Sequence, residues 1–242
     1  MTADSYKEWI KSARLDLRDS ESNHENQEYA RSLYFLQQAS EKAFKAASLK
    51  IGFASSEKRS TLYKEINIPI KTPKDYGHLY KDQFLDQLKA ILDTPIFSIF
   101  FKALGYTNFD RTIERAKKVK VKLNPTDKEV NELINIANSL LEATRKGPLK
   151  DELNQRLKIL KHRIRQLTKP SGKNINGDAL LSWGKSLLPI IQSMIVSIIL
   201  YEFLRPYETA RYPGHFEIDG IKPHLGDVRQ VIMRCLNMIE DS

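Results

Sequence analysis

The residues best suited to chemistry lie in the sequence ARYPGH, which covers residues 210–215. Arg211 stands four residues before His215. An arginine can hold a phosphate through the planar fork of its guanidinium group, and a histidine can move a proton near neutral pH. Such a pair can bind and cut RNA. An arginine and a histidine without any catalytic role can have the same spacing in an ordinary polar turn. We name Arg211 and His215 as the candidate catalytic pair and leave both interpretations open.

The surroundings of this pair favour a site in a loop. Pro213 and Gly214 allow a sharp turn that brings the two side chains together, and loops held by a rigid scaffold are where sites tend to be built. The alternative is a loop that simply seals the end of a helix. Candidate nucleotide or phosphate contacts in the same stretch are Arg205, Tyr207 and Tyr212.

Two other pairs have a similar spacing. Arg18 and His24, and likewise Arg156 and His162, have five residues between them. Such spacings arise by chance in a chain with many arginines, so the spacing alone decides nothing. The chain has no glycine-rich phosphate loop and no cysteine and histidine set typical of zinc sites, so we expect neither a metal nor a cofactor. His224 is expected to be structural.

The chain of 242 residues has a net charge of +9, and the charge is localised. Residues 111–122 carry six basic residues against one acidic, and residues 149–169 carry seven against two. A localised positive charge attracts a polyanion, although a solvated helix face has the same composition. The candidate nucleic-acid-binding residues are Lys158, Lys161, Arg163 and Arg165.

Apolar residues recur at helical spacing along most of the chain, so we predict an all-α fold. Helices are expected near 5–20, 29–51, 78–104 (two helices), 126–145, 149–168, 187–204 and 228–239. The stretch 187–204 is long enough to cross a bilayer, but polar residues interrupt it. We interpret it as the central helix of a bundle and expect that the protein has no membrane partner. The charged N-terminus and the single Cys235 favour the cytoplasm.

Residues 105–178 are predicted to be an insertion that contains a helical hairpin at about 126–168. One apolar stripe runs through Val130, Leu133, Ala137 and Leu140, and another runs through residues 153–167. Gly147 and Pro148 lie between the two stripes, a glycine suited to ending one helix and a proline suited to starting the next.

Several of these pieces resemble one known family. The sequence YFLQQASEKAFKAA, residues 34–47, is similar to the signature helix of the HEPN domain, named for nucleotide-binding proteins of higher eukaryotes and prokaryotes. Further similar pieces follow in the family's order: Trp9 with Asp16 and Leu17, residues 77–79, and residues 211–213. The resemblance covers about residues 1–104 and 179–242, which are therefore predicted to form an antiparallel HEPN-like bundle.

The resemblance implies a protein that binds RNA or nucleotides, commonly as a homodimer. Many family members are metal-independent RNases that use an arginine and a histidine with four to six residues between them, often as the toxin-like half of a toxin–antitoxin pair with a nucleotidyltransferase. Arg211 and His215 have only three residues between them, which departs from that pattern. The alternative is a non-catalytic helical module that docks a nucleotidyltransferase or another protein.

Overall fold

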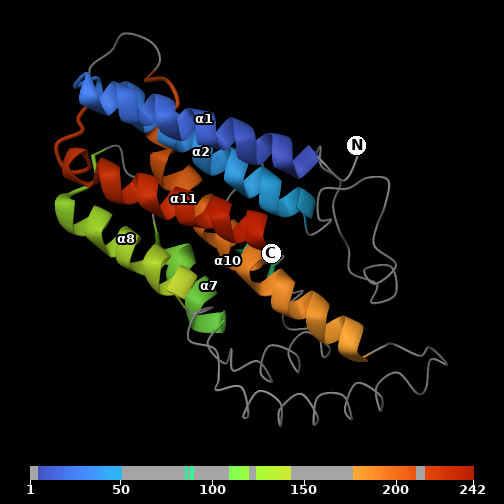
Figure 1. Ribbon diagram of the computed structural model, residues 1–242. Coiled ribbons are helices and arrows are strands. Elements are labelled where there is room, and N and C mark those ends of the chain that lie inside the picture. The colour runs from blue at the N-terminus through green and yellow to red at the C-terminus, as the bar shows by residue number, and fades with distance from the viewer. Residues whose placement is uncertain are drawn as a thin grey trace.

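The computed structural model describes residues 5–50, 85–86, 88–89, 109–119, 124–142, 177–210 and 216–242. The helices in these ranges are α1 (Ser5–Glu25), α2 (Tyr29–Lys50), α7 (Phe109–Lys118), α8 (Asp127–Glu142), α10 (Gly177–Leu204) and α11 (Leu225–Asp241) (Figure 1). Two short 3-10 helices, η2 (Arg205–Tyr207) and η3 (Lys222–His224), lie between α10 and α11. No strand occurs among the described residues, and the predicted all-α fold is confirmed.

Helices α1 and α2 form a tight hairpin and lie side by side in Figure 1. The sequence predicted that α1 would fade in the polar run 20–27, but the helix continues to Glu25. It ends with backbone hydrogen bonds from Gln27 N to His24 O (3.0 Å) and from Glu28 N to Asn23 O (2.8 Å), with Gln27 at a φ of 63°. This is the Schellman ending, which usually has glycine at the position of Gln27.

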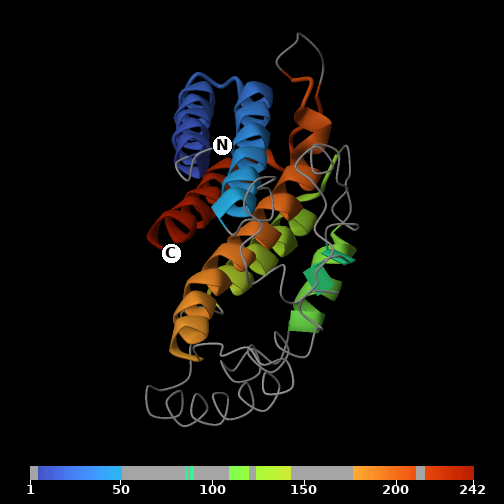
Figure 2. The same ribbon diagram turned by 90° about the vertical axis from the view of Figure 1, so that its right-hand side faces the viewer.

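Helix α10 runs through the middle of the bundle. It contacts α2, α11 and α8, and Figure 2 shows it crossing between α2 and α8. The window Leu187–Tyr207 is long and apolar enough to cross a membrane, with a mean hydropathy of 2.0, yet 89% of it is buried inside this chain. A helix covered on several sides needs apolar residues all round, which agrees with the predicted central helix.

This burial changes the argument for a dimer. A continuous apolar helix that its own bundle leaves uncovered would be a reason for two copies to pair. In the structure the other helices of the same chain cover it, and Leu15 is the one large apolar side chain that is exposed among the described residues. The homodimer therefore stays a prediction that rests on the family resemblance.

Helix α8 begins with a capping box. The Thr126 N–H donates to the Glu129 carboxylate (3.0 Å), and the Glu129 N–H points back to the Thr126 hydroxyl (3.4 Å). The predicted stripe of α8 is buried, and the helix packs against α10 and α11. The second arm of the predicted hairpin lies outside the described residues, so the division into a bundle and an insertion at 105–178 stays a prediction.

We predict that Gly220→Ala destabilises the protein. A Cβ at this position would lie 1.9 Å from the Pro125 carbonyl oxygen, so the chain that leads into α8 would have to move. Overpacking of this kind costs about 1 to 3 kcal/mol, which corresponds to roughly 2 to 10 °C in melting temperature for a chain of this size.

Gly226→Ala is the matched control. No atom lies within 4 Å of a Cβ there, and the residue is in the first turn of α11, so its melting temperature should not fall. Equal melting temperatures for the two variants would contradict the close packing of Pro125 against Gly220.

Candidate functional site

The structure places only some of the predicted site residues. Arg205 and Tyr207 are described, and both lie in η2 at the end of α10. The predicted residues outside the described part of the chain are Arg211, Tyr212, His215, Lys158, Lys161, Arg163 and Arg165. The proposed geometry of the Arg211 and His215 pair therefore stays a prediction. The structure describes the residues that precede and follow this segment.

Tyr207 holds the two ends of the segment 211–215. Its side chain is 1% exposed, its hydroxyl donates to the Glu217 carbonyl (3.4 Å), and its ring lies 6.4 Å from the ring of Phe216. The Ala210 N–H also bonds back to the Tyr207 carbonyl (3.0 Å). Tyr207 thus joins the residues before and after the segment, and this structural role accounts for its burial. Its predicted contact with a nucleotide stays a prediction.

The signature helix α2 borders the same place. It contacts η2. Burial raises the pKa of Tyr201 on α10, and the charge of Glu41 on α2 raises it further. The Arg205 guanidinium lies 3.7 Å from the Glu202 carboxylate, and Glu208 is a further acid beside Tyr201. The charges that act on Tyr201 are therefore three carboxylates and one cation.

The residues that carried the family resemblance also contact one another. The Lys42 ammonium group lies 2.6 Å from the buried carboxylate of Asp16, and the Lys45 ammonium lies 4.8 Å above the Trp9 ring. Burial raises the pKa of Asp16, and the Lys42 charge opposes that rise. Gln38 donates to Gln37 within α2 (2.6 Å). The contacts of Lys42 with Asp16 and of Lys45 with Trp9 join α1 to α2. The residues that resemble the family therefore have a structural function.

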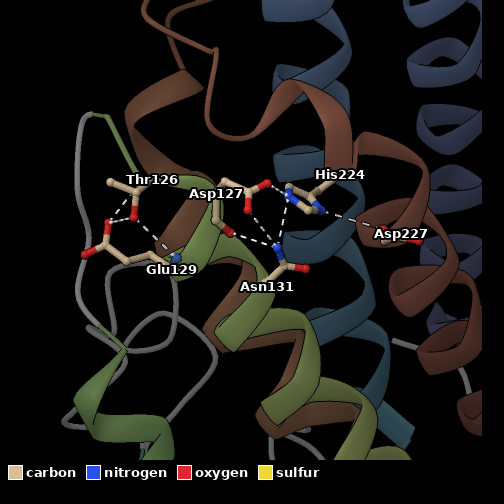
Figure 3. Close-up of polar contacts among 6 residues, drawn as sticks. All are labelled: Thr126, Asp127, Glu129, Asn131, His224 and Asp227. Carbon is tan, nitrogen blue, oxygen red and sulfur yellow. Dashed lines mark hydrogen bonds and ion pairs between the residues drawn. The ribbon is translucent and has the colours of Figure 1, made fainter.

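His224 forms a second polar cluster (Figure 3). Its Nε2 lies 2.7 Å from Asp127 at the start of α8, and its Nδ1 lies 3.7 Å from Asp227 in the first turn of α11. Both ring nitrogens therefore face carboxylates of the protein itself, which fits the predicted structural role. Across the described ranges, no group of three or more histidine, cysteine, aspartate and glutamate side chains could hold a metal.

The described part of the predicted basic segment 111–122 is α7. Arg111, Arg115 and Lys118 are exposed and lie four and three residues apart, so they share one face of the helix. They form no ion pair with the described residues, whereas Lys117 pairs with Asp86 (2.6 Å) and lies 3.8 Å from Glu114. We call the three unpaired residues the α7 basic stripe. Beside it the structure shows a pocket that the sequence did not predict, because its walls come from three helices.

We predict that the free energy of unfolding falls as the pH rises from about 9 to about 12. Burial raises the pKa of Cys235 from 9.0 and that of Tyr207 from 10.0, each to about 12. The unfolded chain releases these protons at the ordinary pKa while the folded chain keeps them, so alkaline pH favours unfolding.

Tyr207→Phe should flatten this fall, because it removes one of the groups that titrates. Urea unfolding at several pH values measures the effect, and the slope matters more than the stability at pH 7, since loss of the hydroxyl also removes a hydrogen bond. Identical slopes for the variant and the wild type would show that Tyr207 ionises alike in both states.

Comparison with known proteins agrees with this fold. Residues 6–147 match the family model of the HEPN domain. The matched region contains α1 and α2, in which the resembling residues contact one another, and it continues through α7 and α8. The chain has no significant match among curated proteins or among solved structures. Because the family model covers more than half of the chain and the described fold is all-α, the protein belongs to the HEPN domain family.

Proposed function

We propose that this HEPN protein binds RNA through the α7 basic stripe and the basic residues of the segment 149–169. Membership of the family connects the protein with functions that involve nucleotides or RNA in general. The observation that carries the proposal is the stripe itself: three exposed cations on one helix face with no acidic partner among the described residues. The homodimer, the nucleotidyltransferase partner and the cytoplasmic location belong to the same proposal.

The distinction between paired and unpaired cations matters for binding. RNA carries one phosphate charge for each nucleotide, and a cation that neutralises it releases counterions. A lysine that already has a carboxylate partner must give up that partner first. Arg111, Arg115 and Lys118 have no such cost, whereas Lys117 does. Three of the four cations of α7 could therefore bind a phosphate without first losing a carboxylate partner, whereas Lys117 could not.

The triple variant Arg111→Gln, Arg115→Gln and Lys118→Gln should bind single-stranded RNA more weakly. The slope of log affinity against log salt should become shallower by about 2, at about 0.7 for each lost phosphate contact. Fluorescence anisotropy over a range of salt concentrations measures both quantities. Lys117→Gln is the control and should change the slope by much less than any single residue of the stripe.

A second variant tests the predicted arm. Changing Lys158, Lys161, Arg163 and Arg165 together to glutamine should also weaken binding and reduce its salt dependence. If both multiple variants bind RNA like the wild type at low salt, the basic segments are only a soluble surface and RNA binding through them is wrong.

We further propose that the bound RNA is cut at the segment 211–215. Arg211 would hold the scissile phosphate, and His215 would deprotonate the ribose 2′-hydroxyl or protonate the leaving oxygen. Tyr207 supports this proposal because it holds both ends of the segment on the buried end of α10. Only three residues separate Arg211 from His215, and this short spacing favours the alternative, a non-catalytic module that docks another protein.

Purified protein should cleave RNA in the presence of EDTA, and Arg211→Ala and His215→Ala should each abolish cleavage without changing helicity by circular dichroism. Arg18→Ala and His162→Ala test the two other pairs and should keep the activity. Cleavage that survives both changes at 211 and 215 would place the chemistry elsewhere. RNA binding without any cleavage by the wild type would favour the non-catalytic alternative.

A further inference from the structure

Residues 216–224 connect the segment 211–215 with α11, and we call them the connector. The later part of the connector forms turns of its own, in which the Lys222 N–H donates to the Ile218 carbonyl (2.8 Å). Residues 216 and 217, which follow the segment 211–215 directly, have no backbone–backbone hydrogen bond to the described part of the chain. Their position therefore depends on side chains from other elements.

The chain that enters α8 lies along the connector. Three contacts occur in the same order along both stretches: the Asn124 amide donates to the Glu217 carboxylate, the Pro125 carbonyl leaves no room for a Cβ at Gly220, and His224 Nε2 lies 2.7 Å from the Asp127 carboxylate. A carboxylate only accepts, so Nε2 is the donor in the last contact. The two stretches, residues 124–127 and 217–224, therefore run side by side in the same direction.

The contact of Asp127 with His224 anchors the far end of the connector. His224 is 8% exposed, and the side-chain amide of Asn131 lies 3.2 Å from the Asp127 carboxylate (Figure 3). A hydrogen bond to an ionised acceptor is stronger than a neutral one, and a buried donor that loses its acceptor is costly. This contact therefore fixes the connector where it joins α11.

Glu217 is held from two sides at the near end. Its carboxylate accepts from Asn124, which precedes α8, and its carbonyl accepts from the Tyr207 hydroxyl in η2 (3.4 Å). Glu217 stands two residues after His215. Two residues of extended chain span at most about 7 Å, so a shift of Glu217 is passed on to His215.

We propose that Asn124 and Asp127 are positioning residues for the segment 211–215 and act on it through the connector. The proposal rests on the proposed cleavage of RNA at that segment. Helix α7 also packs against α8, so the α7 basic stripe and the candidate catalytic residues share one support. The cations of the stripe take no part in the three contacts, so loosening the contacts slows the cut and leaves RNA affinity unchanged.

Amide hydrogen exchange of the full chain tests the contacts without any substrate. The reporters are the N–H groups of Ile221, Lys222 and His224, which are hydrogen-bonded within the connector. In Asp127→Ala they should exchange about fivefold faster, the change expected for the loss of one hydrogen bond. Asp127→Asn keeps an acceptor for His224, and its exchange should stay within about twofold of the wild type.

Cleavage by the same variants tests the positioning role. With saturating RNA, Asn124→Ala and Asp127→Ala should each cut about tenfold more slowly, because a small displacement of a reacting group is costly. Their RNA affinity should stay within about twofold of the wild type, and Asp127→Asn should recover most of the rate. Asn135→Ala is the control, since it removes an exposed side chain from α8 about two turns later and should change neither quantity.

The two measurements can fail separately. Unchanged exchange in Asp127→Ala would overturn the proposal whether or not the protein cuts RNA. Faster exchange with an unchanged rate of cleavage would overturn it as well, since the contacts would then be only structural. If the wild type cuts no RNA, the proposed cleavage is wrong, and faster exchange in Asp127→Ala would still support the positioning of the connector by α8.

Discussion

The close approach of other helices to α2 is the constraint on which the bundle depends. Helix α2 contacts α1, α10 and α11, and it can do so because its inner positions are small. The fully buried alanines are Ala39, Ala43, Ala46 and Ala47. Side chains at the contact set the distance between packed helices, so a larger residue at any of these positions would push α1 or α10 outward. The end of α10, and with it the frame of the segment 211–215, would move as well.

Spacing along the sequence identified the helices better than it identified their partners. The stripes of α2, α8 and α11 are buried as their periodicity predicted. Periodicity says which face of a helix is buried, but it does not say what covers that face. The described neighbours of α8 include α10 and α11, far away in the sequence. The start of α8 also meets the chain at η3, through Pro125 against Gly220 and Asp127 against His224. Neither pair has a recognisable sequence pattern.

The candidate sites show the same division between local and distant information. The sequence showed the positive charge of residues 111–122 but did not predict the helix α7, so the shared face of the basic stripe became visible only in the structure. The pocket could not be read from the sequence, since Arg115, Ile136 and Phe203 come from three helices separated by undescribed stretches of chain. The sequence also could not show that Tyr207 is buried against Phe216, because the residues around it read equally well as an exposed loop.

The end of α10 connects the two surfaces that are proposed to meet RNA. Phe203 faces the pocket beside the α7 basic stripe, and Tyr207, one helical turn later, holds the ends of the segment 211–215. The described charges near Tyr201 are mainly acidic, with Glu41, Glu202 and Glu208, whereas the stripe is basic. Under the proposal that the protein binds RNA, electrostatic attraction would therefore draw the RNA to α7. The two parts of the surface would then have different tasks, because the stripe would supply affinity while Tyr207 fixes the residues before and after 211–215.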